Sequence, residues 1–116
     1  MSKLPSMEQK RAAYAWRVVQ GENDDYTKLA KGAPALIMNN GLMQTLAFYQ
    51  DKKHHSLNKH IIDWLASYFK HDENVLMSFD KMMEALLNAD SQKYRKATEE
   101  TLALLRWIRQ FSAISH

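Results

Sequence analysis

The chain has 116 residues, 46% of them hydrophobic, and its 16 Lys and Arg residues outnumber its 13 Asp and Glu residues to give a formal net charge of +3. This apolar content supports a buried core and excludes wholesale disorder, and the absence of cysteine excludes disulfides and thiolate metal sites. Because no apolar run approaches the roughly 20 residues of a membrane-spanning helix, and the first residues lack an apolar secretory segment, we expect a cytoplasmic protein without a membrane partner.

Apolar residues recur at helical spacing almost throughout the chain, and no segment alternates with the two-residue period of a strand. Glycine and proline are scarce, with three and two residues, which favours long regular elements joined by few tight turns. We therefore predict an all-α fold, a single-domain compact bundle of about five to six helices that covers residues 1–116. The mild positive charge permits a polyanionic partner without requiring one.

The first predicted helix spans about 6–19, with Pro5 or Ser6 at its start and Gly21 beyond its end. A short helix over 24–31 follows, with Asp24 or Asp25 as its N-cap, and Gly32 stops it.

The next predicted helix runs from about Pro34 to Lys52, because proline suits the first helical turn. It contains Gly41, and a glycine in a helix interior costs about 1 kcal/mol relative to alanine. We expect this cost to be offset by the close approach of another backbone. Three further helices are predicted over 56–69, 74–88 and 91–111, the last capped by Asp90 or Ser91.

Residue patterns that support catalysis or metal binding are weak. His54 and His55 lie six and five residues before His60, whereas two imidazoles on one helix face a common ion at spacings of three or four. We interpret this cluster as a solvated, partly cationic loop and helix start. Adjacent acidic pairs such as Glu99 and Glu100 do not face each other on a helix, so we interpret them as solvated faces.

One hypothesis for an enzymatic function is a small helical ribonuclease, because Arg109 and His116 resemble the Arg-x(4–6)-His motif of the HEPN ribonucleases. The histidine is the last residue, where chains usually fray, and this counts against a catalytic role. The sequence has no Gly-x-Ser-x-Gly elbow and no glycine-rich phosphate loop. We therefore predict no catalytic residues, no metal, no cofactor and no enzymatic activity.

Basic residues gather at three places in the sequence. On the first helix, Arg17 follows Lys3 and Lys10 at intervals of seven residues, so the three form one basic stripe. A dense group of positive charges follows at Lys52, Lys53 and Lys59. The last helix carries Arg106. Such patches neutralise phosphates and make binding sensitive to salt. The alternative is an ordinary solvated face, in which Arg95 and Lys96 of the last helix pair with Glu99 and Glu100 one turn later.

The three tryptophans differ in their predicted surroundings. Trp64 lies on the apolar stripe of its helix and is predicted to be in the core. Trp16 and Trp107 lie at the edges of their stripes, where they can cover a helix, stack on bases or serve a subunit interface.

Two stretches of the chain carry a recognisable pattern. Between Pro34 and Phe48 the sequence reads Pro-x-x-Ile, then Asn-Gly-Leu, then Gln-Thr-Leu-Ala-Phe, and Lys52 follows. Near the end come Tyr94, Thr98 and Glu99, and then Leu105, Trp107, Ile108 and Arg109 with Phe111. Their order and spacing resemble the small all-helical subunit of type III-B (Cmr-type) CRISPR effector complexes. One departure is Ala33, where that family often has leucine before the proline.

The resemblance implies a non-catalytic subunit that stacks head to tail in several copies beside larger backbone subunits and lines a channel for the guide–target RNA duplex. The implied partners are guide RNA, target RNA, the backbone and large subunits, and further copies of the chain. Only Lys52 is carried over by motif position. From the residues themselves we predict RNA contacts at Arg17, Lys52, Lys53, Lys59 and Arg106, and a subunit interface at Trp16, Trp107 and Phe111.

The alternative is a standalone helical nucleic-acid-binding module or regulator, for example of the helix-turn-helix type. Gly32 could supply its turn, but the helix that follows is too apolar to read base edges.

Overall fold

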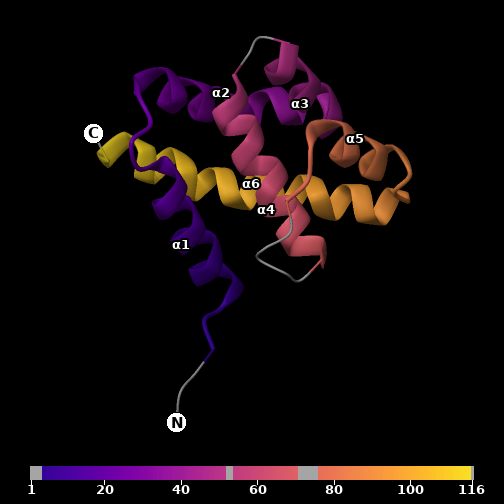
Figure 1. The fold of residues 1–116 in the computed structure, drawn as a ribbon, viewed down its shortest axis with the longest axis horizontal. Helices are drawn as coiled ribbons and strands as arrows, with labels where there is room; N and C mark the ends of the chain where they lie inside the picture. Colours follow the sequence, from indigo (N-terminus) through magenta and orange to yellow (C-terminus); the bar gives the residue numbers. More distant parts are fainter. Residues whose placement is uncertain (1–3, 52–53, 71–75, 116) are drawn as a thin grey trace.

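The computed structural model describes residues 4–51, 54–70 and 76–115, and these residues form six α-helices (Figure 1). The helices are α1 Met7–Val19, α2 Asp24–Asn40, α3 Leu42–Asp51, α4 His55–Lys70, α5 Phe79–Leu87 and α6 Ser91–Ile114. The all-α bundle predicted from the sequence is confirmed. The last and longest helix, α6, crosses the molecule, and α1, α2 and α4 pack against it.

Local side chains begin two helices where the sequence predicts them. Ser6 caps α1 in a reciprocal box, because its hydroxyl accepts from Gln9 N at 3.1 Å and Gln9 Oε1 accepts from Ser6 N at 2.7 Å. Asp90 caps α6 by accepting from Lys93 N at 2.8 Å. The cap predicted at Asp24 or Asp25 is wrong by one position, because Asn23 has the extended backbone of an N-cap and accepts from Tyr26 N.

The sequence analysis predicted that Gly32 ends one helix and that Gly41 lies inside the next, and both predictions are wrong. Helix α2 continues through Gly32 and Pro34, because Ala30, Ala33 and Ile37 form a buried face on both sides of them and hold the helix together. The helix-turn-helix alternative therefore loses the turn that Gly32 was expected to supply.

Gly41 ends α2 instead of lying inside a helix. Its φ is +88° and its ψ is 163°, a conformation that L side chains rarely adopt, and its N–H donates to Ile37 O at 2.8 Å. A Cβ added to Gly41 would meet only Tyr94 Oη, at an ordinary 3.6 Å. Backbone conformation, and not the close approach of another backbone, therefore accounts for this glycine.

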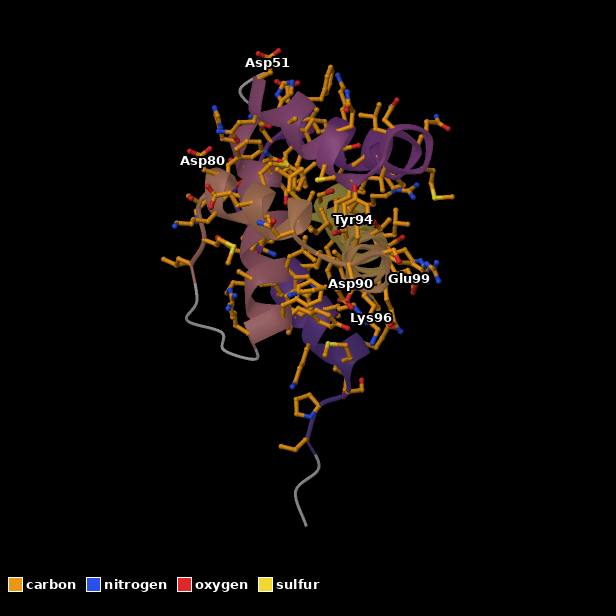
Figure 2. All side chains as sticks on the ribbon, turned by 90° about the vertical axis from the view of Figure 1, so that its right-hand side faces the viewer. Asp51, Asp80, Asp90, Tyr94, Lys96 and Glu99 are labelled. Atoms are coloured by element: carbon orange, nitrogen blue, oxygen red, sulfur yellow. The ribbon has the colours of Figure 1, made fainter. Side chains whose placement is uncertain are left out.

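The start of α3 receives its cap from a distant helix. Gly41 has no side chain to serve as an N-cap, and Met43 N donates instead to the hydroxyl of Tyr94 on α6 at 3.0 Å (Figure 2). Tyr94 and Gly41 belong to the two separate stretches on which the family resemblance rests. The structure brings these two stretches into contact.

Helix α5 begins later than predicted. Its first residue is Phe79, and Ser78 caps it by accepting from Lys81 N at 3.2 Å. Residues 76–78 are not helical, and the start predicted at residue 74 lies outside the described residues. Ser78 has the extended backbone of an N-cap, so α5 begins after it, although the apolar spacing suggested an earlier start. In the part of the chain that the structure describes, no helix has both the length and the apolar character needed to cross a membrane.

Candidate nucleic-acid interface

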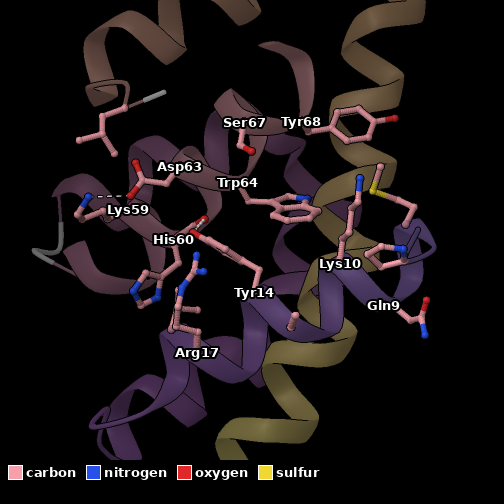
Figure 3. A pocket seen from close by; sticks show the side chains of 15 residues that line it. Gln9, Lys10, Tyr14, Arg17, Lys59, His60, Asp63, Trp64, Ser67 and Tyr68 are labelled. Carbon is pink, nitrogen blue, oxygen red and sulfur yellow. Dashed lines mark hydrogen bonds and ion pairs between the residues drawn. The ribbon is translucent and has the colours of Figure 1, made fainter. Parts of the chain in front are cut away.

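The basic residues predicted to contact RNA lie in two separate hollows of the surface. Arg17 and Lys59 line a groove of about 650 Å³ between α1 and α4, which we call the α1–α4 groove (Figure 3). Arg106 lines a second hollow of about 620 Å³ with Lys31 of α2, which we call the α2–α6 hollow. The remaining predicted residues, Lys52 and Lys53, lie outside the described residues.

Both predicted cations of the α1–α4 groove already have partners within the chain. Lys59 Nζ lies 2.7 Å from Asp63 Oδ2, one turn later on the same helix. The guanidinium carbon of Arg17 lies 5.3 Å from the centre of the Tyr14 ring. Because these contacts use part of each charge, the two residues are weaker phosphate ligands than free cations.

The sequence suggested that His60 belongs to a solvated, partly cationic cluster, but the structure places it beside two tyrosines. Its Nδ1 lies 2.7 Å from the Tyr26 hydroxyl, and the Tyr14 hydroxyl donates to its carbonyl oxygen at 2.7 Å. Burial is the main cause that lowers the pKa of His60 to about 4, so the ring is neutral at pH 7. Burial also raises the pKa of both tyrosines above the usual range.

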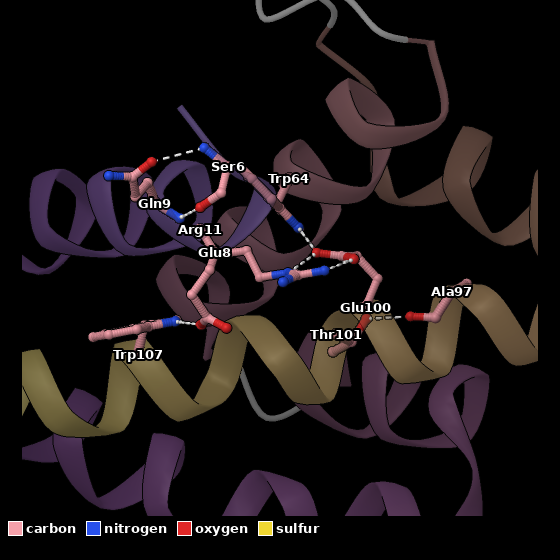
Figure 4. A network of polar contacts seen from close by, with 9 residues as sticks. All are labelled: Ser6, Glu8, Gln9, Arg11, Trp64, Ala97, Glu100, Thr101 and Trp107. Atoms are coloured by element: carbon pink, nitrogen blue, oxygen red, sulfur yellow. Dashed lines mark hydrogen bonds and ion pairs between the residues drawn. The ribbon is translucent and has the colours of Figure 1, made fainter. Parts of the chain in front are cut away.

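A buried polar network lies beneath the groove and joins three helices (Figure 4). Glu100 of α6 accepts from Arg11 Nε at 2.7 Å and from a terminal Arg11 nitrogen at 2.8 Å. Its Oε2 also accepts from Trp64 Nε1 of α4 at 2.9 Å. The hydrogen bond to Glu100 is the main cause that raises the pKa of Arg11. The prediction that Glu100 is a solvated partner of Lys96 is wrong, whereas the core position of Trp64 is confirmed.

The α2–α6 hollow gathers exposed cations that have no intramolecular partner among the described residues. Lys31, Arg106 and Arg109 line it, and within the described residues none of the three forms an ion pair or a hydrogen bond through its side chain. From Thr101 to Ile114, α6 carries these two arginines and no carboxylate. Glu8 also lines the hollow, and it accepts a hydrogen bond from Trp107 Nε1. The hollow is therefore a net positive surface open to an anion.

The first half of α6 differs from this positive surface. Asp90 and Glu99 flank Arg95 and Lys96 there, and Asp90, Lys96 and Glu99 are labelled in Figure 2. Interspersed charges of opposite sign lower the local potential. We therefore give this end no part in phosphate binding.

The three residues predicted to form a subunit interface meet where α1 crosses α6. The ring centre of Phe111 lies 5.2 Å from that of Trp16 and 5.3 Å from that of Trp107. We call these three side chains the aromatic cluster. Trp16 keeps 48% of its surface exposed. The signal in the sequence was the edge position of Trp16 and Trp107 on their helices, and packing of α1 against α6 brings both rings to Phe111.

Sequence reasoning missed Lys31 and Arg11. Lys31 was placed at the end of a short helix, and only the continuous α2 carries it to the hollow beside α6. Arg11 meets Glu100 across a separation of 89 residues, so no local spacing could have indicated their pairing.

The described residues thus form an all-α bundle with two basic hollows and an aromatic cluster in which Trp16 is half exposed. The family profile described as CRISPR-associated protein (Cas_Cmr5) matches residues 7–115. The chain is also 30% identical over 96 residues to the CRISPR system Cmr subunit Cmr5 of Thermotoga maritima, over 80% of this chain and 68% of that protein. The chain belongs to this family of small subunits of type III-B Cmr complexes, which confirms the resemblance found in the sequence.

Proposed function

We propose that the chain is a non-catalytic structural subunit of a type III-B CRISPR effector complex. In this proposal several copies stack beside larger subunits and line the channel that holds the guide–target RNA duplex. Base pairing between guide and target supplies sequence specificity, and the protein contacts the phosphate backbone. Family membership supports the place in the complex, and the charges of the surface support the contacts with RNA.

The α2–α6 hollow is the observation that carries the proposed RNA contact. Lys31, Arg106 and Arg109 come from two helices and converge on one surface without an internal partner among the described residues. A guanidinium group binds phosphate oxygens with two parallel hydrogen bonds, so the arginines suit a phosphodiester backbone. Arg17 and Lys59 make weaker contributions, because Tyr14 and Asp63 already engage them.

The proposed stacking between copies rests on the aromatic cluster. Trp16 is half exposed although it packs edge-on against Phe111, and tryptophan is enriched among the residues that dominate protein interfaces. A contact between different surfaces of successive copies does not close on itself and can extend along a duplex.

Support for a non-catalytic role comes from the groups that would otherwise serve as acid or base. His60 is neutral and tied to the Tyr26 hydroxyl, and Glu100 accepts three hydrogen bonds in a buried ion pair. The ribonuclease hypothesis needs His116, which lies outside the described residues.

The RNA contact is tested in the assembled complex by the double variant Arg106→Glu/Arg109→Glu. Its matched control is Arg95→Glu/Lys96→Glu, which makes the same charge change on the same helix among carboxylates. Target RNA affinity is measured over a series of salt concentrations, with native mass spectrometry to verify assembly. We expect weaker binding and a salt slope smaller by roughly one unit for each lost contact in the first variant alone. Wild-type affinity and slope in that variant would refute the contact.

Stacking is tested separately with Trp16→Ala. Loss of an interface anchor should lower the number of copies per complex in native mass spectra, with the isolated chain still folded. An unchanged copy number would remove the aromatic cluster from the interface.

A further inference from the structure

The floor of the α1–α4 groove is made of ring carbon. The rings of Tyr14 and Trp64 pack against each other with their centres 5.0 Å apart and their planes tilted by 41°. Their polar atoms are turned to partners inside the protein, because the Tyr14 hydroxyl donates to His60 O and Trp64 Nε1 donates to Glu100. Both side chains line the groove (Figure 3). They therefore offer it apolar surface and no free hydrogen-bonding atom.

Exposed side chains of Met7 and Leu76 add further apolar surface to the groove. Met7 and Leu76 line the same groove and expose 40% and 76% of their surface. Contiguous exposed apolar surface is a common feature of protein interaction sites.

Positive charges stand along the edge of the groove. Lys10 and Arg17 are seven residues apart on α1, so two helical turns separate them on one side of that helix. The one carboxylate among the groove residues that the structure describes is Asp63, which is paired with Lys59. No described carboxylate offsets Lys10 or Arg17 through an ion pair.

We propose that the α1–α4 groove docks a segment of a partner protein, an amphipathic stretch with aliphatic or aromatic residues on one face and at least two carboxylates beside them. The apolar residues cover the floor between Met7 and Trp64, and the carboxylates meet Lys10 and Arg17. RNA fits this surface less well, because nucleic-acid interfaces are polar and would leave Met7 and Leu76 uncovered. The main proposed RNA contact uses the α2–α6 hollow and does not depend on this inference, in which Arg17 serves the docked segment instead of adding weakly to RNA binding.

The test is a selection of random-sequence displayed peptides against the full chain, followed by titration of the enriched peptides. We expect the enriched peptides to combine apolar residues at helical spacing with two or more Asp or Glu residues. Backbone amide shifts should change in α1 and α4. The variant Lys10→Glu/Arg17→Glu should weaken binding about tenfold or more. Leu76→Ser should also weaken it at constant charge.

The matched control is Lys81→Glu/Leu87→Ser, which makes charge and apolar changes on the exposed surface of α5 and should bind as the wild type does. The inference is overturned if no acidic amphipathic peptide is enriched, or if the shifts map elsewhere. It is also overturned if Leu76→Ser has no effect, since the groove would then bind by charge alone. Two further results count against it: displacement of the peptide by a short single-stranded RNA, and groove shifts that follow protein concentration without peptide, which would indicate a second copy as occupant.

Discussion

Replacing Arg11 with methionine removes one side of the buried ion pair and leaves Glu100 without its two charge-assisted hydrogen bonds. The Glu100 side chain is 3% exposed and retains only the bond from Trp64, whereas Arg11 is 19% exposed. Methionine preserves most of the packing of the arginine stem, so the variant reports the charge more than the volume.

The structure sets the size of the effect. Breaking a buried pair by removing one partner costs about 3–5 kcal/mol, and the partial exposure of Arg11 places this pair at the lower limit, ~3 kcal/mol. An unfolding entropy of about 2.1 cal/mol/K per residue over 116 residues converts this loss to a decrease in Tm of ~12 °C.

Urea denaturation followed by circular dichroism measures the loss, with Lys10→Met as the control on the same helix. Lys10 is exposed and its replacement should change the unfolding free energy by less than about 0.5 kcal/mol. Adding Glu100→Gln to Arg11→Met should restore part of the stability, because the uncompensated charge is removed and the amide oxygen still accepts from Trp64. A loss below about 1 kcal/mol for Arg11→Met, or additive effects in the double variant, would refute the reasoning.

Three further variants test other features of the fold. Gly41→Ala should destabilise the protein by about 1–3 kcal/mol because of its positive φ, whereas Gly32→Ala in the interior of α2 should stabilise it by up to about 1 kcal/mol; both are measured by urea denaturation. Tyr94→Phe should cost about 1 kcal/mol, because it removes the acceptor for Met43 N. The pKa of His60 is lowered from 6.5 to about 4, so between these values the unfolded chain binds a proton that the folded chain does not. Stability should therefore fall by up to about 3 kcal/mol as the pH falls through this window, and His60→Asn should flatten this part of the profile.

Each of these expectations has a contrary result. Equal effects of alanine at Gly41 and Gly32 would mean that backbone conformation does not distinguish the two positions. A wild-type stability for Tyr94→Phe would show that water replaces the hydroxyl as the cap. A His60→Asn profile that runs parallel to the wild-type profile between pH 6.5 and 4 would contradict the neutral buried ring.

The sequence predicts those parts of the fold that depend on neighbouring residues. The helix starts at Ser6 and Asp90 were predicted because an N-cap contacts residues two or three positions away. Neighbouring residues do not show that Gly32 lies inside a helix whereas Gly41 ends one. The buried residues on both sides of Gly32 hold α2 together, and a contact with α6 completes the start of α3. Both effects come from packing between distant segments.

For the candidate site, too, the sequence predicts features that depend on position within one helix but not those that depend on packing between helices. Trp16 and Trp107 were predicted at the edges of their helical stripes, and the structure brings their rings together with that of Phe111. Their role between copies stays a prediction. The separation of Arg17 and Lys59 from Arg106 could not be foreseen, because it depends on which helices adjoin each groove. Lys52 and Lys53 also stay predictions.

The position of α6 in the chain has a consequence for synthesis on the ribosome. This helix is made after the other five described helices, yet α1, α2 and α4 all pack against it, and the contact between Arg11 and Glu100 spans 89 residues. The apolar surfaces by which α1, α2 and α4 contact α6 therefore have no partner until α6 has been synthesised. Packing of the bundle should therefore wait for α6 to emerge from the ribosome, and until then the nascent chain should present these apolar helix faces to chaperones.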